Sequence, residues 1–215
     1  MLNSRFERFR HFSFDLDGTL VDSVALMEKA WSTVNIETGI EIPFVRYKQF
    51  IGLPFEKILA CLGVKEGRSE IRKIYFEKTA SLATSIKAYE GAVRLLRWLD
   101  SQPDIIVSII TSKPNDNALQ ILDNLELPYA VLVGGDDLTF GKPYADPFNR
   151  VVDYMGLSPE DRLNSIYFGD VLSDFVFSIN ARIHYCHCNY GFYGNLPKLV
   201  RNSYMSIDSL NEVLS

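Results

Sequence analysis

Two aspartates, Asp15 and Asp17, are the residues whose types and spacing most directly suggest chemistry. They follow an apolar run, residues 12–14, that is typical of the end of a buried strand. Side chains two positions apart on an extended chain point the same way, so both carboxylates are expected to face one spot, and Gly18 allows a turn there. The pair offers a nucleophile, an acid/base group and part of a metal site. The alternative is a solvated Asp-Gly turn.

Two hydroxyl side chains follow another predicted strand. Thr111 is the last residue of an isoleucine- and valine-rich segment, residues 104–111, and Ser112 follows it shortly before a predicted helix. Hydroxyl groups and free backbone N–H groups at a helix start suit an anion such as phosphate. A local turn or helix cap at Thr111 is the alternative.

A lysine and two more aspartates follow later strands. Lys142 stands between a glycine and a proline, so its position is defined, and its ammonium can neutralise both a carboxylate and phosphate charge. An isolated lysine is more often a solvated surface group. Asp170 and Asp174 straddle the end of a strand and the start of a helix, where hard carboxylate oxygens suit magnesium. Alternatively, Asp174 caps or charges that helix.

The elements that position these residues change type along the chain. No strand pattern stands out between roughly residues 23 and 86, and helical patterns occupy 24–34, 44–50, 55–62 and 71–82. Beyond residue 86, strands alternate with helices, which predicts βαβ units and a parallel sheet. The predicted strands are 104–111, 129–133, 166–168 and 183–188, and the predicted helices are 91–99, 114–125, 146–155, 173–181 and 208–214. Ligands of such sheets bind beyond the carboxyl ends of the strands.

Composition bounds the class of protein. The chain has 215 residues, 47% of them hydrophobic, and a net charge of -5 without long runs of one sign, which argues against nucleic acid as the main partner. No stretch approaches about 18 consecutive apolar residues, so no membrane span is expected. The first ten residues lack the apolar run of a secretory signal. Three cysteines give no disulfide framework, so a cytoplasmic protein is expected.

Two further segments contain residues that could form a site. His184, Cys186, His187 and Cys188 suggest zinc, but His187 points away from the others on a strand and no second group completes a tetrahedral set. Ordinary strand residues are therefore expected. The segment 191–194, aromatic and bounded by glycines, favours a plain turn, with a substrate-facing loop as the alternative.

Four motifs in order carry a family resemblance. The DLDGTLVDS string starting at Asp15 resembles the first motif of the haloacid dehalogenase superfamily, in the phosphatase branch that includes phosphoglycolate phosphatases and β-phosphoglucomutases. Thr111 matches the second motif, GKPYADPF around Lys142 the third and GDVLSD from Gly169 the fourth. The resemblance covers about residues 12 to 195. The chain departs from the pattern at Ala145, where proline is frequent, and at Arg182, where glycine is common.

The resemblance implies an α/β fold with a doubly wound, mostly parallel Rossmann-like sheet and an inserted α-helical cap. The core would comprise residues 1–22 and 87–215, and the cap residues 23–86. The implied activity is magnesium-dependent hydrolysis of a small phosphorylated metabolite, either phosphoglycolate-like or a sugar phosphate, through an aspartyl-phosphate intermediate.

The resemblance also implies a role for each motif residue. Asp15 would attack phosphorus, and Asp17 would protonate the leaving oxygen and then deprotonate the water. Mg²⁺ would be held by Asp15, the Asp17 carbonyl and Asp170, with Asp174 as a further ligand or support. The implied phosphate-binding residues are Gly18, Thr19, Thr111, Ser112 and Lys142.

Alternative activities remain on the same fold. A phosphomutase is disfavoured because that branch usually has valine at the position of Thr19, and a dehalogenase because that branch lacks the second aspartate, Asp17. A non-catalytic binder of phosphorylated ligands is the third alternative. In the cap, Arg46, Lys48 and residues 51–55 are candidates for selecting the substrate, although solvation is the commoner role of such charges. The oligomeric state has no signature in the sequence.

Overall fold

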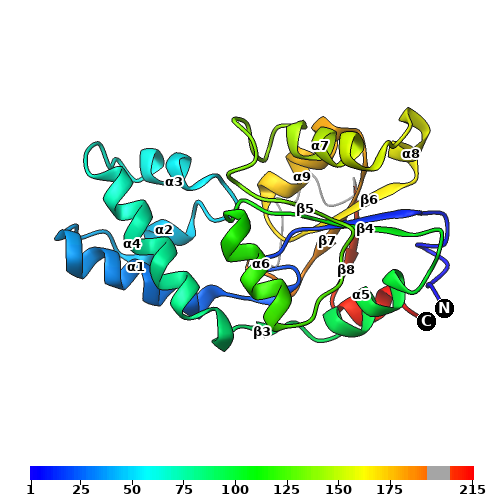
Figure 1. The fold of residues 1–215 in the computed structure, drawn as a ribbon, viewed down its shortest axis with the longest axis horizontal. Helices are drawn as coiled ribbons and strands as arrows, with labels where there is room; N and C mark the ends of the chain where they lie inside the picture. Colours follow the sequence, from blue (N-terminus) through cyan, green and yellow to red (C-terminus); the bar gives the residue numbers. More distant parts are fainter. Residues whose placement is uncertain (193–203) are drawn as a thin grey trace.

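A six-stranded parallel sheet forms the centre of the molecule (Figure 1). The computed structural model describes residues 1–192 and 204–215. Every pair of neighbouring strands runs parallel, so all carboxyl ends meet at one edge. The strand order is β5 (Val131–Val133), β4 (Ile106–Ile110), β1 (His11–Phe14), β6 (Ser165–Gly169), β7 (His184–Cys188) and β8 (Met205–Ile207).

Helices cover both faces of this sheet, because strand side chains alternate between the faces. In β6, Ile166 and Phe168 join the hydrophobic cluster beneath two helices, α5 (Ala92–Asp100) and α6 (Asn115–Asn124), whereas Tyr167 joins a second cluster beneath α7 (Asp146–Met155) and α9 (Leu172–Ala181). The predicted doubly wound α/β fold is confirmed. The helices are α5 (Ala92–Asp100), α6 (Asn115–Asn124), α7 (Asp146–Met155), α8 (Pro159–Leu163) and α9 (Leu172–Ala181), and the 3-10 helix η3 (Leu210–Val213) closes the chain.

A lobe of helices lies between β1 and α5 in the chain and stands at one end of the molecule (Figure 1). We call residues 24–85 the helical lobe. Within this fully described range there is no strand, as predicted. Buried aromatic rings hold the lobe together, with Trp31 against Tyr47 at 4.7 Å between ring centroids. Its helices are α1 (Val24–Thr38), α2 (Phe44–Lys48), α3 (Phe55–Cys61), α4 (Arg68–Ser81) and the 3-10 helix η1 (Ala83–Ser85).

Two short strands flank the lobe and join it to the sheet domain. β2 (Val21–Asp22) pairs antiparallel with β3 (Lys87–Ala88), so the chain leaves and returns at one place. The two chain ends also meet: the Ser215 N–H donates to the Met1 carbonyl at 2.9 Å. None of the helices in residues 1–192 and 204–215 is long and apolar enough to cross a membrane.

The structure differs from the sequence expectations in short elements. The strand ending at Cys188 is not the last one, because β8 follows and forms the sheet edge. β2, β3 and α8 were also missed, since two to five residues are too few to show a periodicity. Arg182 adopts a left-handed conformation with φ of 57°, and β7 still follows it.

The histidines and cysteines of β7 are ordinary strand residues by position. Cys186 and Cys188 are buried in the cluster beneath α5 and α6. His187 lies on the other face, where its Nδ1 is 3.0 Å from the Tyr185 hydroxyl. This alternation follows the prediction.

Candidate active site

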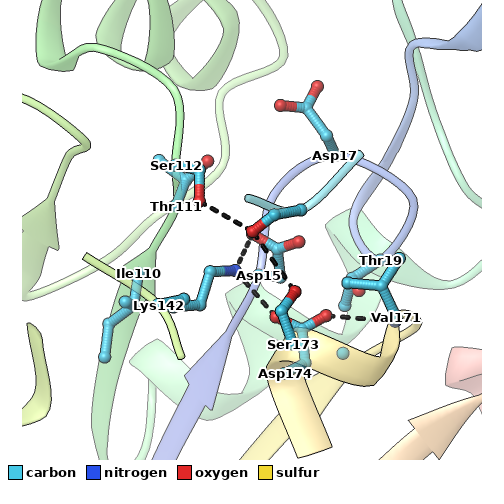
Figure 2. Close-up of polar contacts among 12 residues, drawn as sticks. Asp15, Asp17, Thr19, Ile110, Thr111, Ser112, Lys142, Val171, Ser173 and Asp174 are labelled. Atoms are coloured by element: carbon cyan, nitrogen blue, oxygen red, sulfur yellow. Dashed lines mark hydrogen bonds and ion pairs between the residues drawn. The ribbon is translucent and has the colours of Figure 1, made fainter. Parts of the chain in front are cut away.

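Three carboxylates meet at the carboxyl edge of the sheet. Asp15 follows β1, Asp170 follows β6 and Asp174 lies in the first turn of α9. One oxygen from each lies within 4.8 Å of the others, and all three residues are buried. Figure 2 shows two of the three, Asp15 and Asp174, next to Lys142. The parallel sheet brings these side chains together from two strand ends that are 155 positions apart in the sequence. This proximity was predicted, because each aspartate follows a strand.

Lys142 supplies positive charge to this cluster. Its ammonium lies 2.9 Å from Asp15 Oδ1 and 2.8 Å from Asp174 Oδ1, and it donates to the Tyr167 hydroxyl at 3.0 Å. The side chain is almost completely buried. Burial alone would lower the pKa of Lys142, but the carboxylates of Asp15 and Asp174 outweigh it and raise that pKa. The lysine is therefore a fixed cation, not a surface group.

One ammonium does not balance three buried carboxylates. Burial raises the pKa of Asp15 to about 7, although Lys142 opposes this shift. Burial, followed by repulsion from Asp174 and Asp15, raises the pKa of Asp170 well above its usual range. A hard divalent cation would relieve this repulsion, and carboxylate oxygens are the ligands that such ions prefer. The donor set therefore fits Mg²⁺.

The backbone around Asp170 leaves its carboxylate little freedom. Gly18 has φ of +86°, and a Cβ there would stand 2.5 Å from Asp170 Oδ2, so the close approach requires glycine. The Phe192 N–H donates to the same oxygen at 2.6 Å, and the Thr19 hydroxyl donates to Oδ1 at 3.5 Å. The start of the 191–194 segment thus reaches the site, while its other half lies outside the described residues.

Asp174 combines the two roles considered for it. Its Oδ1 faces Lys142, while its Oδ2 accepts the backbone N–H groups of Asp170 and Val171 at 3.1 and 3.2 Å. The second pair of contacts is the helix-capping arrangement that stood as the alternative. Asp174 therefore anchors both the lysine and the turn that carries Asp170.

The Asp17 side chain lies apart from the cluster. Its Oδ2 is 3.2 Å from the Lys113 ammonium, and its Oδ1 accepts the Ser23 hydroxyl at 2.5 Å. In Figure 2 it points away from Asp15. The expectation that both carboxylates face one spot is corrected: both line one cleft, but Asp17 is outside the three-carboxylate group. The chain stops being extended at Asp15, so the two-residue alternation no longer applies.

The two predicted hydroxyl residues have local partners. The Thr111 hydroxyl accepts the Lys113 N–H at 3.2 Å, which is the turn considered as the alternative, and Thr111 also lines the cleft. The Ser112 hydroxyl donates to the Gly52 carbonyl of the helical lobe at 3.1 Å, and the Ser173 hydroxyl donates to the same carbonyl at 3.2 Å. Their roles toward phosphate stay predictions.

Sequence reasoning missed three contributors to the site: Lys113, the Tyr167 hydroxyl and the Phe192 N–H. Of these, only Lys113 could have been found from the sequence. It directly precedes Pro114, the residue that caps α6, and Lys142 likewise precedes a proline. Ser23 occupies the N-cap of α1, but its hydroxyl binds Asp17 and makes no capping bond.

The helical lobe supplies the opposite wall of the cleft. Ile51, Gly52, Leu53 and Phe55 line it, as expected for the 51–55 segment. Arg46, in contrast, is exposed and is absent from the lining. The cleft holds about 510 Å³ of empty space, part of it open to solvent.

Comparison with known proteins places this site in a family. The model of the haloacid dehalogenase-like hydrolase family matches residues 13–188. The chain therefore belongs to the haloacid dehalogenase-like hydrolases, and it is an enzyme of their phosphatase type.

Similar proteins agree with that family. Phosphoglycolate phosphatase 1 of Pseudomonas aeruginosa is 28% identical over 94% of this chain and 77% of its own length. The phosphoglycolate phosphatase of Escherichia coli O157:H7 is 27% identical over 96% of this chain and 93% of its own. Among solved structures, a haloacid dehalogenase-like hydrolase from Bacteroides fragilis, described as putative, superposes with a TM-score of 0.81 at 22% identity, covering 96% of this chain and 100% of that one. CbbY from Rhodobacter sphaeroides, solved in complex with phosphate, has a TM-score of 0.80 at 17% identity, covering 95% and 96%.

Proposed function

We propose that this chain is a magnesium-dependent phosphatase that hydrolyses a small phosphate monoester through a phosphorylated Asp15. The observation that carries the proposal is the environment of Asp15: a buried carboxylate at the floor of a cleft, 2.9 Å from the Lys142 ammonium. The lysine favours the charged, nucleophilic form of the carboxylate and offsets charge on a phosphoryl group above it. Phosphoglycolate-like esters and sugar phosphates are the first substrates to test, given the names of the relatives.

Asp17 is placed to move protons without competing for Asp15. Its carboxylate lines the same cleft but is bound by Lys113 and Ser23, so it stays separate from the three-carboxylate cluster. We assign it the general acid/base role: it protonates the leaving oxygen and then takes a proton from the attacking water. The Thr111 hydroxyl and backbone N–H groups near Gly18 would complete the phosphate cradle.

The carboxylates of Asp15 and Asp170, with the Asp17 carbonyl and with Asp174 behind them, would hold Mg²⁺. When bound, the ion would offset charge on the phosphoryl oxygens. Residues 23–86 would act as a cap that covers the cleft and excludes water during phosphorylation of Asp15.

Phosphate release from small esters tests the proposal. With Mg²⁺ present, we expect turnover of p-nitrophenyl phosphate and of at least one phosphorylated metabolite, and loss of both in excess EDTA. Manganese should restore activity as another hard ion. Full turnover in EDTA would contradict the metal assignment, and absence of free phosphate would contradict hydrolysis. Formation of an isomeric phosphate ester in its place would favour the phosphomutase.

A further inference from the structure

The wall of the cleft that faces Asp15 consists of rings. Tyr47, Phe55, Tyr75 and Phe76 line it from α2, α3 and α4, together with aliphatic side chains such as Leu53. The rings contact one another, with 4.8 Å between the centroids of Phe55 and Tyr75 and 5.0 Å between those of Phe55 and Phe76. The alcohol part of a bound ester would rest on this wall, because the phosphoryl group must sit at Asp15.

The polar groups of this wall are uncharged. Tyr47 and Tyr75 are buried, and burial raises the pKa of both phenols, so they carry no charge at neutral pH. Their rings lie against each other, with 5.5 Å between the centroids. Such phenols can accept or donate a hydrogen bond, but they cannot neutralise an anion.

The cations of the described cleft lining stand on the opposite side. Lys113 and Lys142 both come from the sheet domain, and both contact carboxylates, at Asp17 and at Asp15 with Asp174. In the lobe, Arg68 and Arg72 are absent from the cleft lining and have partners of their own: the Arg72 guanidinium lies 4.9 Å from the centre of the Phe76 ring, and Arg68 donates to the Val64 carbonyl. A carboxylate against the ring wall would lose its hydration without gaining a cationic partner.

We infer from this wall that the substrate's alcohol part is uncharged and carries a ring or a comparably flat apolar group, and that esters with a carboxylate in that position are poor substrates. The inference rests on the proposed phosphatase function and narrows its substrate class. It also separates this chain from what the names of its relatives suggest, since the alcohol of phosphoglycolate carries a carboxylate.

A matched pair of esters tests the effect of a negative charge on the alcohol part of the substrate. 4-Methylbenzyl phosphate and 4-carboxybenzyl phosphate have the same alkyl leaving oxygen and nearly the same shape, and they differ in one negative charge at the far end of the ring. We expect kcat/KM to be roughly 10²-fold higher for the methyl compound, because the carboxylate must be desolvated against the rings. Phosphoglycolate should also fall at least about 10-fold below the methyl compound, since it lacks the ring.

A variant of the wall provides the second readout. Leu53 lines the cleft and is half-buried, so Leu53→Arg adds a cation to the wall, and Leu53→Gln is the uncharged control. The arginine should raise kcat/KM for 4-carboxybenzyl phosphate by about 10-fold, and the glutamine should not. Thermal unfolding checks that both variants fold, and if the arginine variant does not, the ester pair on the unaltered enzyme decides.

The possible results separate this inference from the proposed function. Phosphate release from the methyl compound, with the carboxylated esters poor, supports both. Equal or better turnover of 4-carboxybenzyl phosphate or phosphoglycolate would overturn the inference and leave the phosphatase intact, with Lys113 as the residue that takes the carboxylate. No phosphate release from any of the three esters, nor from p-nitrophenyl phosphate, would overturn both.

Discussion

The two walls of the cleft differ in the chemistry of their side chains. The sheet side buries Asp15, Asp170 and Asp174 around one lysine, whereas the lobe side presents rings and aliphatic side chains. Buried charges need partners at hydrogen-bonding distance, so each member of the sheet wall depends on its neighbours. Rings are held by packing, which tolerates exchange between side chains of similar volume. We therefore expect the sheet wall to determine whether the reaction happens and the lobe wall to determine which ester reacts.

One replacement in each wall tests these two roles, and it should give the largest effects. Asp15→Asn removes the nucleophile and should lower kcat for p-nitrophenyl phosphate by roughly 10⁴-fold or more. Phe76→Leu replaces a ring of the lobe wall with an aliphatic side chain and should lower kcat/KM for the same ester by no more than about 10-fold. Comparable losses of activity from both replacements would contradict the assignment of reaction to the sheet wall and of selectivity to the lobe wall.

Stability should also depend on how many partners a buried lysine has. Lys142→Met leaves Asp15 and Asp174 without their cation and should lower the free energy of unfolding by about 3 kcal/mol or more. Lys113→Met is the matched control, and it should cost less, because Asp17 keeps the Ser23 hydroxyl and is more exposed. Urea unfolding of both variants in EDTA measures the difference. A larger loss for Lys113→Met would show that the three-carboxylate cluster does not depend on Lys142.

His11, at the other end of strand β1, offers a buried group that stays neutral. Its ring nitrogens lie 3.2 Å from the Ser165 hydroxyl and 2.8 Å from that of Ser108. Burial lowers the pKa of His11 from 6.5 to about 4, although Asp161 opposes the shift. Between these values the unfolded chain binds the extra proton, so the contribution of His11 to stability is complete above pH 6.5 and is lost as the pH falls toward 4. The loss should amount to about 3 kcal/mol.

The measurement is the free energy of unfolding from pH 4 to 7 for the unaltered protein and for His11→Gln. The difference between the two should change across this window, whereas parallel curves would contradict the assignment. Subtraction is needed because Asp15 acts in the opposite direction. Its pKa of about 7 in the metal-free protein gives stability that is present below its usual pKa and is lost as the pH rises through 7.

The two walls of the cleft also contact each other at Gly52. Gly52 has φ of +95°, and a Cβ there would lie 2.5 Å from Val171 and 2.7 Å from the Ser173 hydroxyl, so Gly52→Ala should push the lobe away from the sheet domain. We expect kcat/KM to fall by about 10-fold, mainly through KM. Gly39→Ala is the control, since Gly39 has φ of +71° and nothing within 4 Å of the added Cβ. Equal kinetics for both variants would show that this contact does not shape the cleft.

Much of the sheet wall could be predicted from the sequence because its residues follow strands. Parallel strands end at one edge, so Asp15, Asp170 and Asp174 had to approach one another once the βαβ pattern was recognised. The position of Lys142 between glycine and proline also predicted a lysine with a defined place in the site. The helical lobe was predictable as helices from its apolar spacing, and the 51–55 segment as part of the cleft.

The remaining features depend on contacts between distant segments. Asp17 could not be oriented, because the turn after β1 is organised by backbone bonds to the Leu16 carbonyl, and these end the alternation of an extended chain. The donation from the Phe192 N–H to Asp170 joins segments that no local pattern connects. β8 has three residues, too few for a period to appear.

Trapping the phosphorylated enzyme tests the central claim most directly. Asp17→Asn keeps the nucleophile but removes the acid/base group, which typically contributes about 10² to 10⁴-fold. An activated aryl phosphate, whose leaving group departs without a proton, should phosphorylate this variant, and the adduct should persist because its hydrolysis lacks a base. Intact-mass spectrometry after an acid quench should show one added phosphoryl group on Asp17→Asn and none on Asp15→Asn. An adduct on Asp15→Asn, or its absence from Asp17→Asn, would contradict the assignment of Asp15 as the nucleophile and Asp17 as the acid/base residue.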